Sequence, residues 1–221
     1  MARILFTSKA GGFSRPPFDS FNLALHVSDS PLDVEANRRK LESEFSVSRV
    51  IFMDQTHSNV VAVVDEETQE SPNADALFTR TKGLALAVLV ADCIPLLLHS
   101  IDAVAAVHVG RRGMTNGIIE KVVNTFRTYS DAPISADLGP SICDKCYEVD
   151  LPMYQEVIGS VPASATSIER HCLDLPSGVT SILNSLDITS KNWSVCTRES
   201  SNHFSYRKNT ITGRQAGVVA L

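Results

Sequence analysis

The sequence predicts a mixed α/β fold (α+β), in which buried mixed β-sheets are flanked by helices. Three observations predict it. The run LALAVLV at 84–90 has no polar alternation and is typical of a strand buried on both faces. Two further apolar runs, IPLLLHS at 94–100 and AVAAVHV at 103–109, continue from it as a hairpin. Apolar residues then recur at helical spacing over 118–126, which indicates an amphipathic helix packed on the sheet.

The segments before this centre predict strands, one helix and polar loops. A first strand is expected near 4–6, followed by an irregular loop. Ser30-Pro31, with Asp33 in the first turn, predicts the start of a helix that runs to about Phe45. The stretch 49–57 is expected to be a strand that ends at His57, and 59–65 another. Residues 65–75 are polar and predict a surface loop.

After the hairpin the pattern alternates again. Pro95 removes a backbone donor and suggests a bend. A strand is expected at 134–142, short helices after Pro152 and near 179–186, and two strands around a polar loop within 193–221. Neither a repeat nor a linker is visible, so residues 1–221 are expected to form a single domain.

Composition narrows the classes of function. The 221 residues are 43% hydrophobic and 20% charged, as in ordinary globular proteins. A net charge of -5 gives no reason to expect a nucleic acid or an anionic membrane as partner. Asp92 and Pro95 interrupt the central apolar run well short of the roughly 20 residues of a membrane helix. Five cysteines without a signal peptide predict reduced thiols and a cytoplasmic protein, while its protein partners stay open.

Three residues at the ends of different strands form a candidate metal site: His57, Cys93 and His108. Two imidazoles and a thiolate suit Zn²⁺, and three protein ligands leave a fourth position for water or substrate. The alternative is a small buried cysteine with two hydrogen-bonded histidines. Asp92 is expected either to act as a base or orient a ligand, or to cap a backbone turn.

The other cysteines and several cations are further candidates for a functional role. The Cys143-x-x-Cys146 spacing suits half of a zinc ribbon, a redox pair or structural packing, whereas Cys172 and Cys196 are expected to pack in the interior. Four cations flank predicted loops and suit either an anion site or a solvated surface: Arg111, Arg112, Arg207 and Lys208. Glycine-rich phosphate loops are absent from the sequence.

Several motifs in order resemble those of the laccase-domain family, which includes polyphenol oxidoreductases and purine nucleoside phosphorylases. They are FNLALHVSD, NRRKL, QTHSNVV, ADALFT, LAVLVADCIPLLL, HVGRRG, LGPSICDKCYEV and FSYRKNTITGRQAG. The resemblance implies that His57, Cys93 and His108 bind the catalytic metal. Arg112 and Arg207 match family positions, and one of them is predicted to bind phosphate, while His26 is predicted to help orient the nucleoside.

Two positions depart from the family pattern. Arg111 stands where the family usually has tryptophan, so a cation replaces an aromatic wall and a shifted or narrower nucleoside preference is expected. Lys145-Cys146 stands in place of paired cysteines.

The resemblance implies two chemistries. One is zinc-dependent phosphorolysis of adenosine, inosine or guanosine, with adenosine deamination and methylthioadenosine cleavage as related activities. The other is copper-dependent oxidation of phenols, since copper can displace zinc from nitrogen and sulfur ligands. The chain has six histidines and no H-x-H pair, which disfavours a self-sufficient multicopper centre. A non-enzymatic metal-binding protein is the third interpretation.

Overall fold

Two mixed sheets form the centre of the computed structural model, which describes residues 2–166 and 169–221. Across these residues the strands fall into a four-stranded and a six-stranded sheet. The order in the first sheet is β1 (Arg3–Phe6), β10 (Gln215–Ala220), β5 (Leu84–Val90) and β2 (Arg49–Ile51). The order in the second is β3 (Val61–Val63), β4 (Ala76–Thr79), β7 (Val104–Val109), β6 (Ile94–His99), β8 (Ser135–Leu138) and β9 (Thr189–Asn192).

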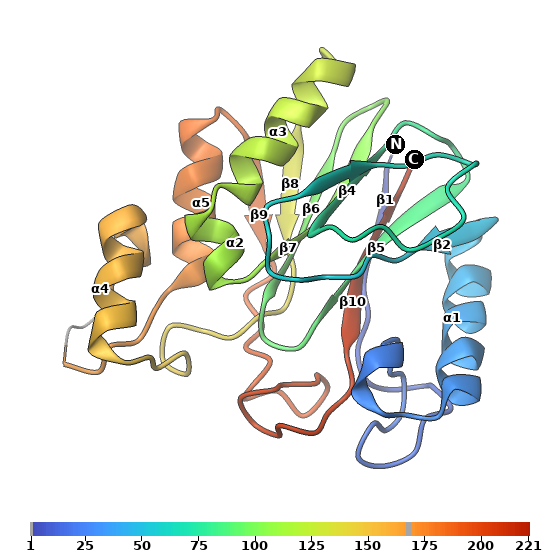
Figure 1. The fold of residues 1–221 in the computed structure, drawn as a ribbon, viewed down its shortest axis with the longest axis horizontal. Coiled ribbons are helices and arrows are strands. Elements are labelled where there is room, and N and C mark those ends of the chain that lie inside the picture. Colours follow the sequence, from blue (N-terminus) through green and yellow to red (C-terminus); the bar gives the residue numbers. More distant parts are fainter. Residues whose placement is uncertain (1, 167–168) are drawn as a thin grey trace.

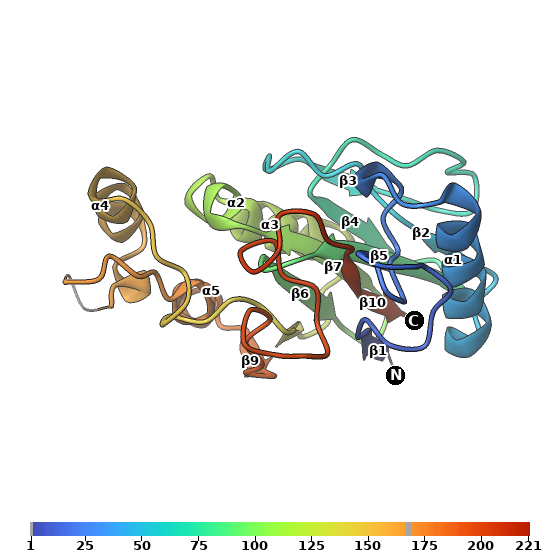
Figure 2. The same ribbon diagram turned by 90° about the horizontal axis from the view of Figure 1, so that it is seen from below.

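Helices cover the outer faces of both sheets (Figures 1 and 2). Helix α1 (Pro31–Phe45) lies on the side of the four-stranded sheet. The other helices gather on the side of the six-stranded sheet: α2 (Arg111–Thr115), α3 (Ile118–Tyr129), α4 (Leu151–Ser160) and α5 (Leu175–Ser185). Two short 3-10 helices, η1 (Leu25–Val27) and η2 (Pro162–Ser164), lie in connecting segments.

Strand β7 shows why both faces of the six-stranded sheet are apolar. Val104 and Ala106 belong to the core between the sheets, together with Leu86 of β5. The alternate residues Ala105 and Val107 pack in the core shared with the helices. Since successive strand residues point to opposite faces, a strand covered on both sides must be apolar throughout. The predicted mixed α/β fold with buried sheets flanked by helices is therefore confirmed.

The chain passes from one sheet to the other between β5 and β6. Strand β5 ends at Val90 in the four-stranded sheet, and β6 begins at Ile94 in the six-stranded sheet. Asp92, in the short connection, has a φ of 98°, which is rare for a residue other than glycine. The connection from β2 to β3 also joins the two sheets, and it contains His57. Residues of these two connections therefore meet at the same edge.

The predicted helices at 31–45 and 118–126 are confirmed. Ser30 caps α1 by accepting a hydrogen bond from the Asp33 amide at 3.4 Å, with Pro31 in the first turn. The apolar positions of the second helix are all buried in α3, namely Ile118, Ile119, Val122, Val123 and Phe126.

The strand predicted at 49–57 is too long, because β2 ends at Ile51. Beyond it, the backbone of Asp54 forms an isolated bridge with Asn73, and side chains supply further hydrogen bonds. The side-chain amide of Gln55 pairs with the backbone of Leu89. Its Nε2 donates to the Leu89 carbonyl at 2.8 Å, and its Oε1 accepts from the Leu89 backbone amide at 2.9 Å.

The C-terminal prediction is wrong in position. The first of the two strands is β9, which ends at Asn192, before the segment in which it was expected. It is a polar and largely exposed edge strand, so its sequence lacks the alternating apolar residues that would predict a strand.

The bend expected at Pro95 is also misplaced, because Pro95 lies inside β6 and its carbonyl accepts a hydrogen bond from the Gly139 amide at 3.0 Å. Among the described helices, none is both long and apolar enough to cross a membrane.

Candidate active site

The three predicted ligands lie together at the edge where the sheets are joined. One ligand atom from each of His57, Cys93 and His108 lies within 4.8 Å of the others. The two imidazole rings meet edge to face, with centroids 4.7 Å apart. His57 lies on the connection from β2 to β3, Cys93 immediately before β6, and His108 near the end of β7.

Asp75 fixes the orientation of two of these ligands. It is fully buried, and its Oδ1 contacts His108 Nδ1 at 2.8 Å and accepts from the His57 amide at 3.0 Å. Its Oδ2 accepts from the amide and hydroxyl of Ser58 at 2.6 and 2.7 Å. A carboxylate on Nδ1 leaves Nε2 of His108 free to bind a metal. Sequence reasoning missed Asp75, although it lies in the ADALFT motif just before β4.

Gly110 keeps space open beside the ligands. A Cβ atom at this position would lie 3.0 Å from Cys93 Sγ and 3.2 Å from His57 Cδ2. A larger residue would therefore require Cys93 or His57 to move by a few tenths of an ångström, and glycine avoids this displacement.

The charges in the cluster favour a thiolate. Burial alone would raise the pKa of Cys93, but the charge of His108 and the nearby imidazoles outweigh it and lower the pKa to about 6. Burial likewise opposes the charge on His108, yet the Cys93 thiolate and Asp75 raise its pKa to about 9. Although burial opposes its charge, the contacts with His108 and Ser58 hold the pKa of Asp75 far below the ordinary value.

This donor set fits zinc. A thiolate and two imidazoles, one of them backed by a carboxylate, are the ligands and the outer contact that zinc sites use. The three ligands line a cavity of about 410 Å³, a size typical of small-molecule sites. The fourth coordination position therefore has room for a substrate.

The cavity contains most of the other predicted site residues. His26, Asp92 and Arg207 line it, whereas Arg112 is exposed on α2 and does not. Its neighbour Arg111 lines the cavity instead. Further lining residues that sequence reasoning did not select are Gln55, Tyr147, Tyr206 and Arg214. Arg214 belongs to the TGRQAG motif, which was the available signal.

Asp92 is held by two loops. Its carboxylate accepts from the Thr197 hydroxyl and from the Arg207 amide, each at 2.7 Å. The carbonyl of Asp92 also accepts from the Ile142 amide at 2.9 Å. These contacts match the predicted capping of a backbone turn, and Asp75 rather than Asp92 contacts a ligand imidazole.

Part of the cavity wall is basic. Burial and the positive charge of Arg214 lower the pKa of His26, so its imidazole is neutral at pH 7. Arg207 stacks over the Tyr147 ring at 4.9 Å and donates to the Glu148 carbonyl at 2.7 Å. Among the described residues, neither Arg207 nor Arg214 has a carboxylate within salt-bridge distance.

The chain matches known proteins along almost its whole length. Residues 3–221 match the family model described as multi-copper polyphenol oxidoreductase laccase. A Corynebacterium glutamicum protein named as a purine nucleoside phosphorylase is 41% identical over 99% of this chain and 94% of its own length. The Escherichia coli protein named purine nucleoside phosphorylase YfiH is 33% identical over 97% of this chain and 92% of its own length.

Solved structures agree with the sequence matches. The crystal structure of a Neisseria meningitidis protein superposes with a TM-score of 0.91 at 30% identity, covering 100% of this chain and 94% of that one. The Bacillus licheniformis protein YfiH superposes with a TM-score of 0.88 at 29% identity, covering 100% and 92%. With its sequence and its fold in agreement, the chain belongs to the multi-copper polyphenol oxidoreductase laccase family.

Proposed function

We propose that this chain is a zinc-dependent purine nucleoside phosphorylase, in which residues 1–221 act as one catalytic domain. It would convert adenosine, inosine or guanosine to the free base and ribose 1-phosphate, with adenosine deamination and methylthioadenosine cleavage as further activities. One observation carries the proposal: the cluster of His57, Cys93 and His108 shares a cavity with Arg207 and Arg214, and neither arginine has a carboxylate within salt-bridge distance among the described residues. The five free cysteines suit a reducing cytoplasm.

The arginines supply a phosphate site. Guanidinium groups bind phosphate through paired N–H donors, and an arginine that faces a cavity without an ion-pair partner of its own favours an anionic ligand. Arg207 uses one terminal nitrogen on the Glu148 carbonyl, which holds the side chain in place and leaves other donors free. Arg214 is half-buried and donates to the carbonyls of Thr212 and Gly213 at 2.9 and 3.0 Å. Both arginines are therefore oriented before phosphate binds.

The same cavity offers surfaces for a purine. Tyr147 and Tyr206 contribute aromatic rings, and Leu89 and Ile142 contribute apolar contacts. Aromatic rings bind the flat face of a base by stacking. A neutral His26 can donate one hydrogen bond and accept another, which suits the ring nitrogens or sugar hydroxyls of a nucleoside.

Cleavage of an N-glycosidic bond builds positive charge on the ribose and negative charge on the departing base. Preorganised charged groups stabilise such a change without rearranging. Here the arginines would hold the anionic nucleophile, and Asp75 would keep His108 in one orientation. Zinc bound by the three ligands would supply a Lewis acid. None of these roles requires a redox-active metal.

Arg111 is expected to modify substrate choice. It lines the cavity and lies 3.7 Å from Glu156 of α4, so its guanidinium is held near the wall. The family tryptophan at this position would offer a stacking surface instead. We therefore expect a shifted or narrower nucleoside preference relative to proteins that carry the tryptophan.

Two other functions remain as outcomes of the test. The family description and the pairing of two histidines with a cysteine both suit copper-dependent phenol oxidation. A metal-binding protein without catalysis would need no room beside its ligands, whereas this cluster borders a cavity of about 410 Å³. Phosphorolysis uses both the ligands and the basic wall.

The test is base release by zinc-loaded, copper-free protein from adenosine and inosine, with and without phosphate, followed by chromatography. Phosphate-dependent release that disappears in His108→Ala supports the proposal. Arg207→Ala and Arg214→Ala should raise the KM for phosphate, each by about tenfold or more if one charge-assisted contact is lost.

Arg112→Ala is the matched comparison. Arg112 was a candidate phosphate ligand from its motif, but its side chain lies outside the cavity lining. A raised phosphate KM in Arg112→Ala alone would support the motif prediction against the cavity arginines. No base release from any purine nucleoside, together with phenol oxidation that scales with bound copper, would overturn the proposal.

A further inference from the structure

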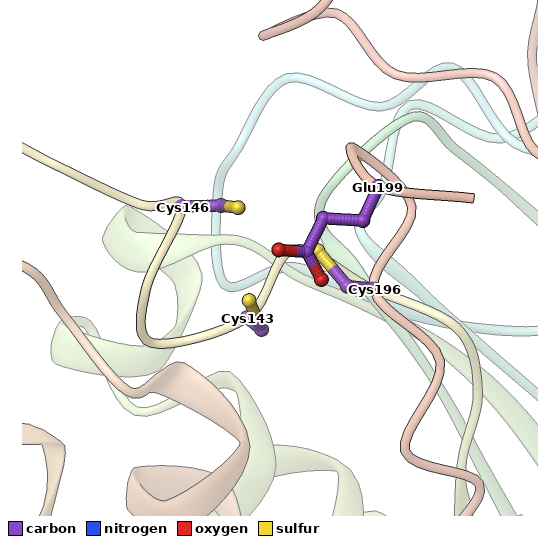
Figure 3. A group of neighbouring side chains, drawn as sticks. All are labelled: Cys143, Cys146, Cys196 and Glu199. Carbon is purple, nitrogen blue, oxygen red and sulfur yellow. The ribbon is translucent and has the colours of Figure 1, made fainter.

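A second cluster of metal-binding side chains lies outside the candidate active site. One ligand atom from each of Cys143, Cys146, Cys196 and Glu199 lies within 4.8 Å of the others. Figure 3 shows the three sulfur atoms and the carboxylate turned toward one another. Cys146 is buried, Cys143 and Cys196 are half-buried, and Glu199 is exposed. The cluster thus converges on a common point near the surface.

The backbone brings these residues together before any metal binds. Cys143 and Cys146 lie in a turn in which the amides of Cys146 and Tyr147 both donate to the Cys143 carbonyl at 3.1 Å. The segment before this turn pairs with the other segment through a bridge between Ser141 and Cys196. The Thr197 amide donates to the Ser141 carbonyl at 3.0 Å. Two loops that are distant in sequence are therefore fixed side by side.

The arrangement fits a tetrahedral ion. Zinc binds sulfur at about 2.3 Å, so neighbouring ligands of a tetrahedral site lie roughly 3.8 Å apart. The observed limit of 4.8 Å requires only a small inward movement of the side chains. Three thiols converge here, whereas a disulfide joins only two. A disulfide would leave the third thiol without a role, and a metal uses all three.

We propose that Cys143, Cys146 and Cys196, with Glu199 as fourth ligand, bind a structural zinc ion. Four protein ligands close the coordination sphere, which distinguishes such a site from one that keeps an open position for substrate. Cys143, Cys196 and Glu199 border a surface hollow of about 380 Å³, which gives the ion a path of entry. The inference does not depend on the reaction at the first cluster.

The zinc would fasten two walls of the cavity. Tyr147 follows Cys146 and lines the cavity. Thr197 follows Cys196 and donates to the Asp92 carboxylate, which also holds the Arg207 amide. Joining the two loops through a metal would therefore restrain both an aromatic and a basic side of the substrate site.

Metal content of the full chain, purified under reducing conditions, tests this inference. Elemental analysis should give about two zinc ions per chain, one for each cluster. Cys143→Ser/Cys196→Ser should retain about one, and so should Cys93→Ala, because each loses a different ion. Cys172→Ser changes a buried cysteine outside both clusters and should keep both ions.

Cobalt gives an independent reading if the double variant fails to fold. Cys93→Ala loaded with cobalt should show strong thiolate-to-cobalt charge-transfer absorption, because the remaining site has three thiolates. Glu199→Gln should retain this absorption with weaker cobalt binding. Absence of the absorption in Cys93→Ala would overturn the inference. So would a single zinc ion per wild-type chain that Cys93→Ala abolishes, or a mapped disulfide between Cys143 and Cys196 in the reduced preparation.

Discussion

Asp75→Asn should loosen the metal site with almost no change of shape. An asparagine keeps one oxygen and replaces the other with an NH₂ donor. If the NH₂ faces His108, Nδ1 must accept and Nε2 carries the proton, so the nitrogen that should bind zinc is blocked. If it faces Ser58, two short contacts at 2.6 and 2.7 Å are disrupted.

The magnitude follows from the contacts. The first orientation removes the acceptor of the His57 amide, and the second removes the acceptor of both Ser58 contacts. One or two hydrogen bonds to a charged group are lost, each worth about 1.5–3 kcal/mol, so the free energy of unfolding should fall by about 1.5–6 kcal/mol. Loss of an outer contact to a metal-binding histidine typically weakens metal affinity by about 10–100-fold. Chelator competition measures the zinc affinity, and urea denaturation of the metal-free protein measures stability.

Asp137→Asn is the matched control. Asp137 on β8 also pairs with a histidine, His99 at 3.1 Å, and accepts from the Trp193 indole at 3.0 Å, but it lies outside both metal clusters. This variant should lose stability and keep the zinc affinity of the wild type. Wild-type zinc affinity in Asp75→Asn would refute the argument that Asp75 positions His108.

Three further results are expected. Gly110→Ala should lower the zinc content and reduce the free energy of unfolding by about 1–3 kcal/mol, because the new Cβ would lie 3.0 Å from Cys93 Sγ. Elemental analysis and urea denaturation measure the two effects, and full zinc content would contradict the prediction. Asp92→Asn should raise the phosphate KM more than it lowers kcat, because the carboxylate holds the Arg207 amide; a changed kcat–pH profile with an unchanged KM would instead indicate proton transfer. In the metal-free protein the pKa of Cys93 is lowered to about 6, so its thiolate should persist down to that pH. Alkylation of Cys93, located by mass spectrometry, should therefore slow only as the pH falls through 6. His108→Ala should move this transition to higher pH, and an unmoved transition would show that the imidazolium is not its cause.

The positions of the candidate ligands Cys93 and His108 could be predicted because each lies where an apolar pattern stops. Cys93 follows the fully buried β5, and His108 lies at the end of another buried strand. Strand ends in a buried sheet leave few directions for a polar side chain, so their convergence follows from topology. Helix α3 was predictable because burial of one face fixes the period of its apolar residues.

The partners of the ligands could not be predicted in this way. Asp75 reaches His108 across 33 residues, and no local pattern marks a carboxylate as the acceptor of several loop amides. The choice between Arg111 and Arg112 depends on a short helix that the sequence did not reveal. Adjacent helical residues point about 100° apart, so only one of the two can face the cavity.

The position of β10 has a consequence for how the protein folds. This strand lies between β1 and β5, pairing Arg3 with Ala220 on one side and Ala85 with Ala220 on the other. Of all the described strands it is the last to leave the ribosome, whereas every strand of the six-stranded sheet precedes it. Until then, the apolar β5 has an unpaired edge that can join a second nascent chain. Pairing across such sequence distances also slows folding. We expect assembly of this protein to benefit from chaperones that shield β5 until β10 has been synthesised.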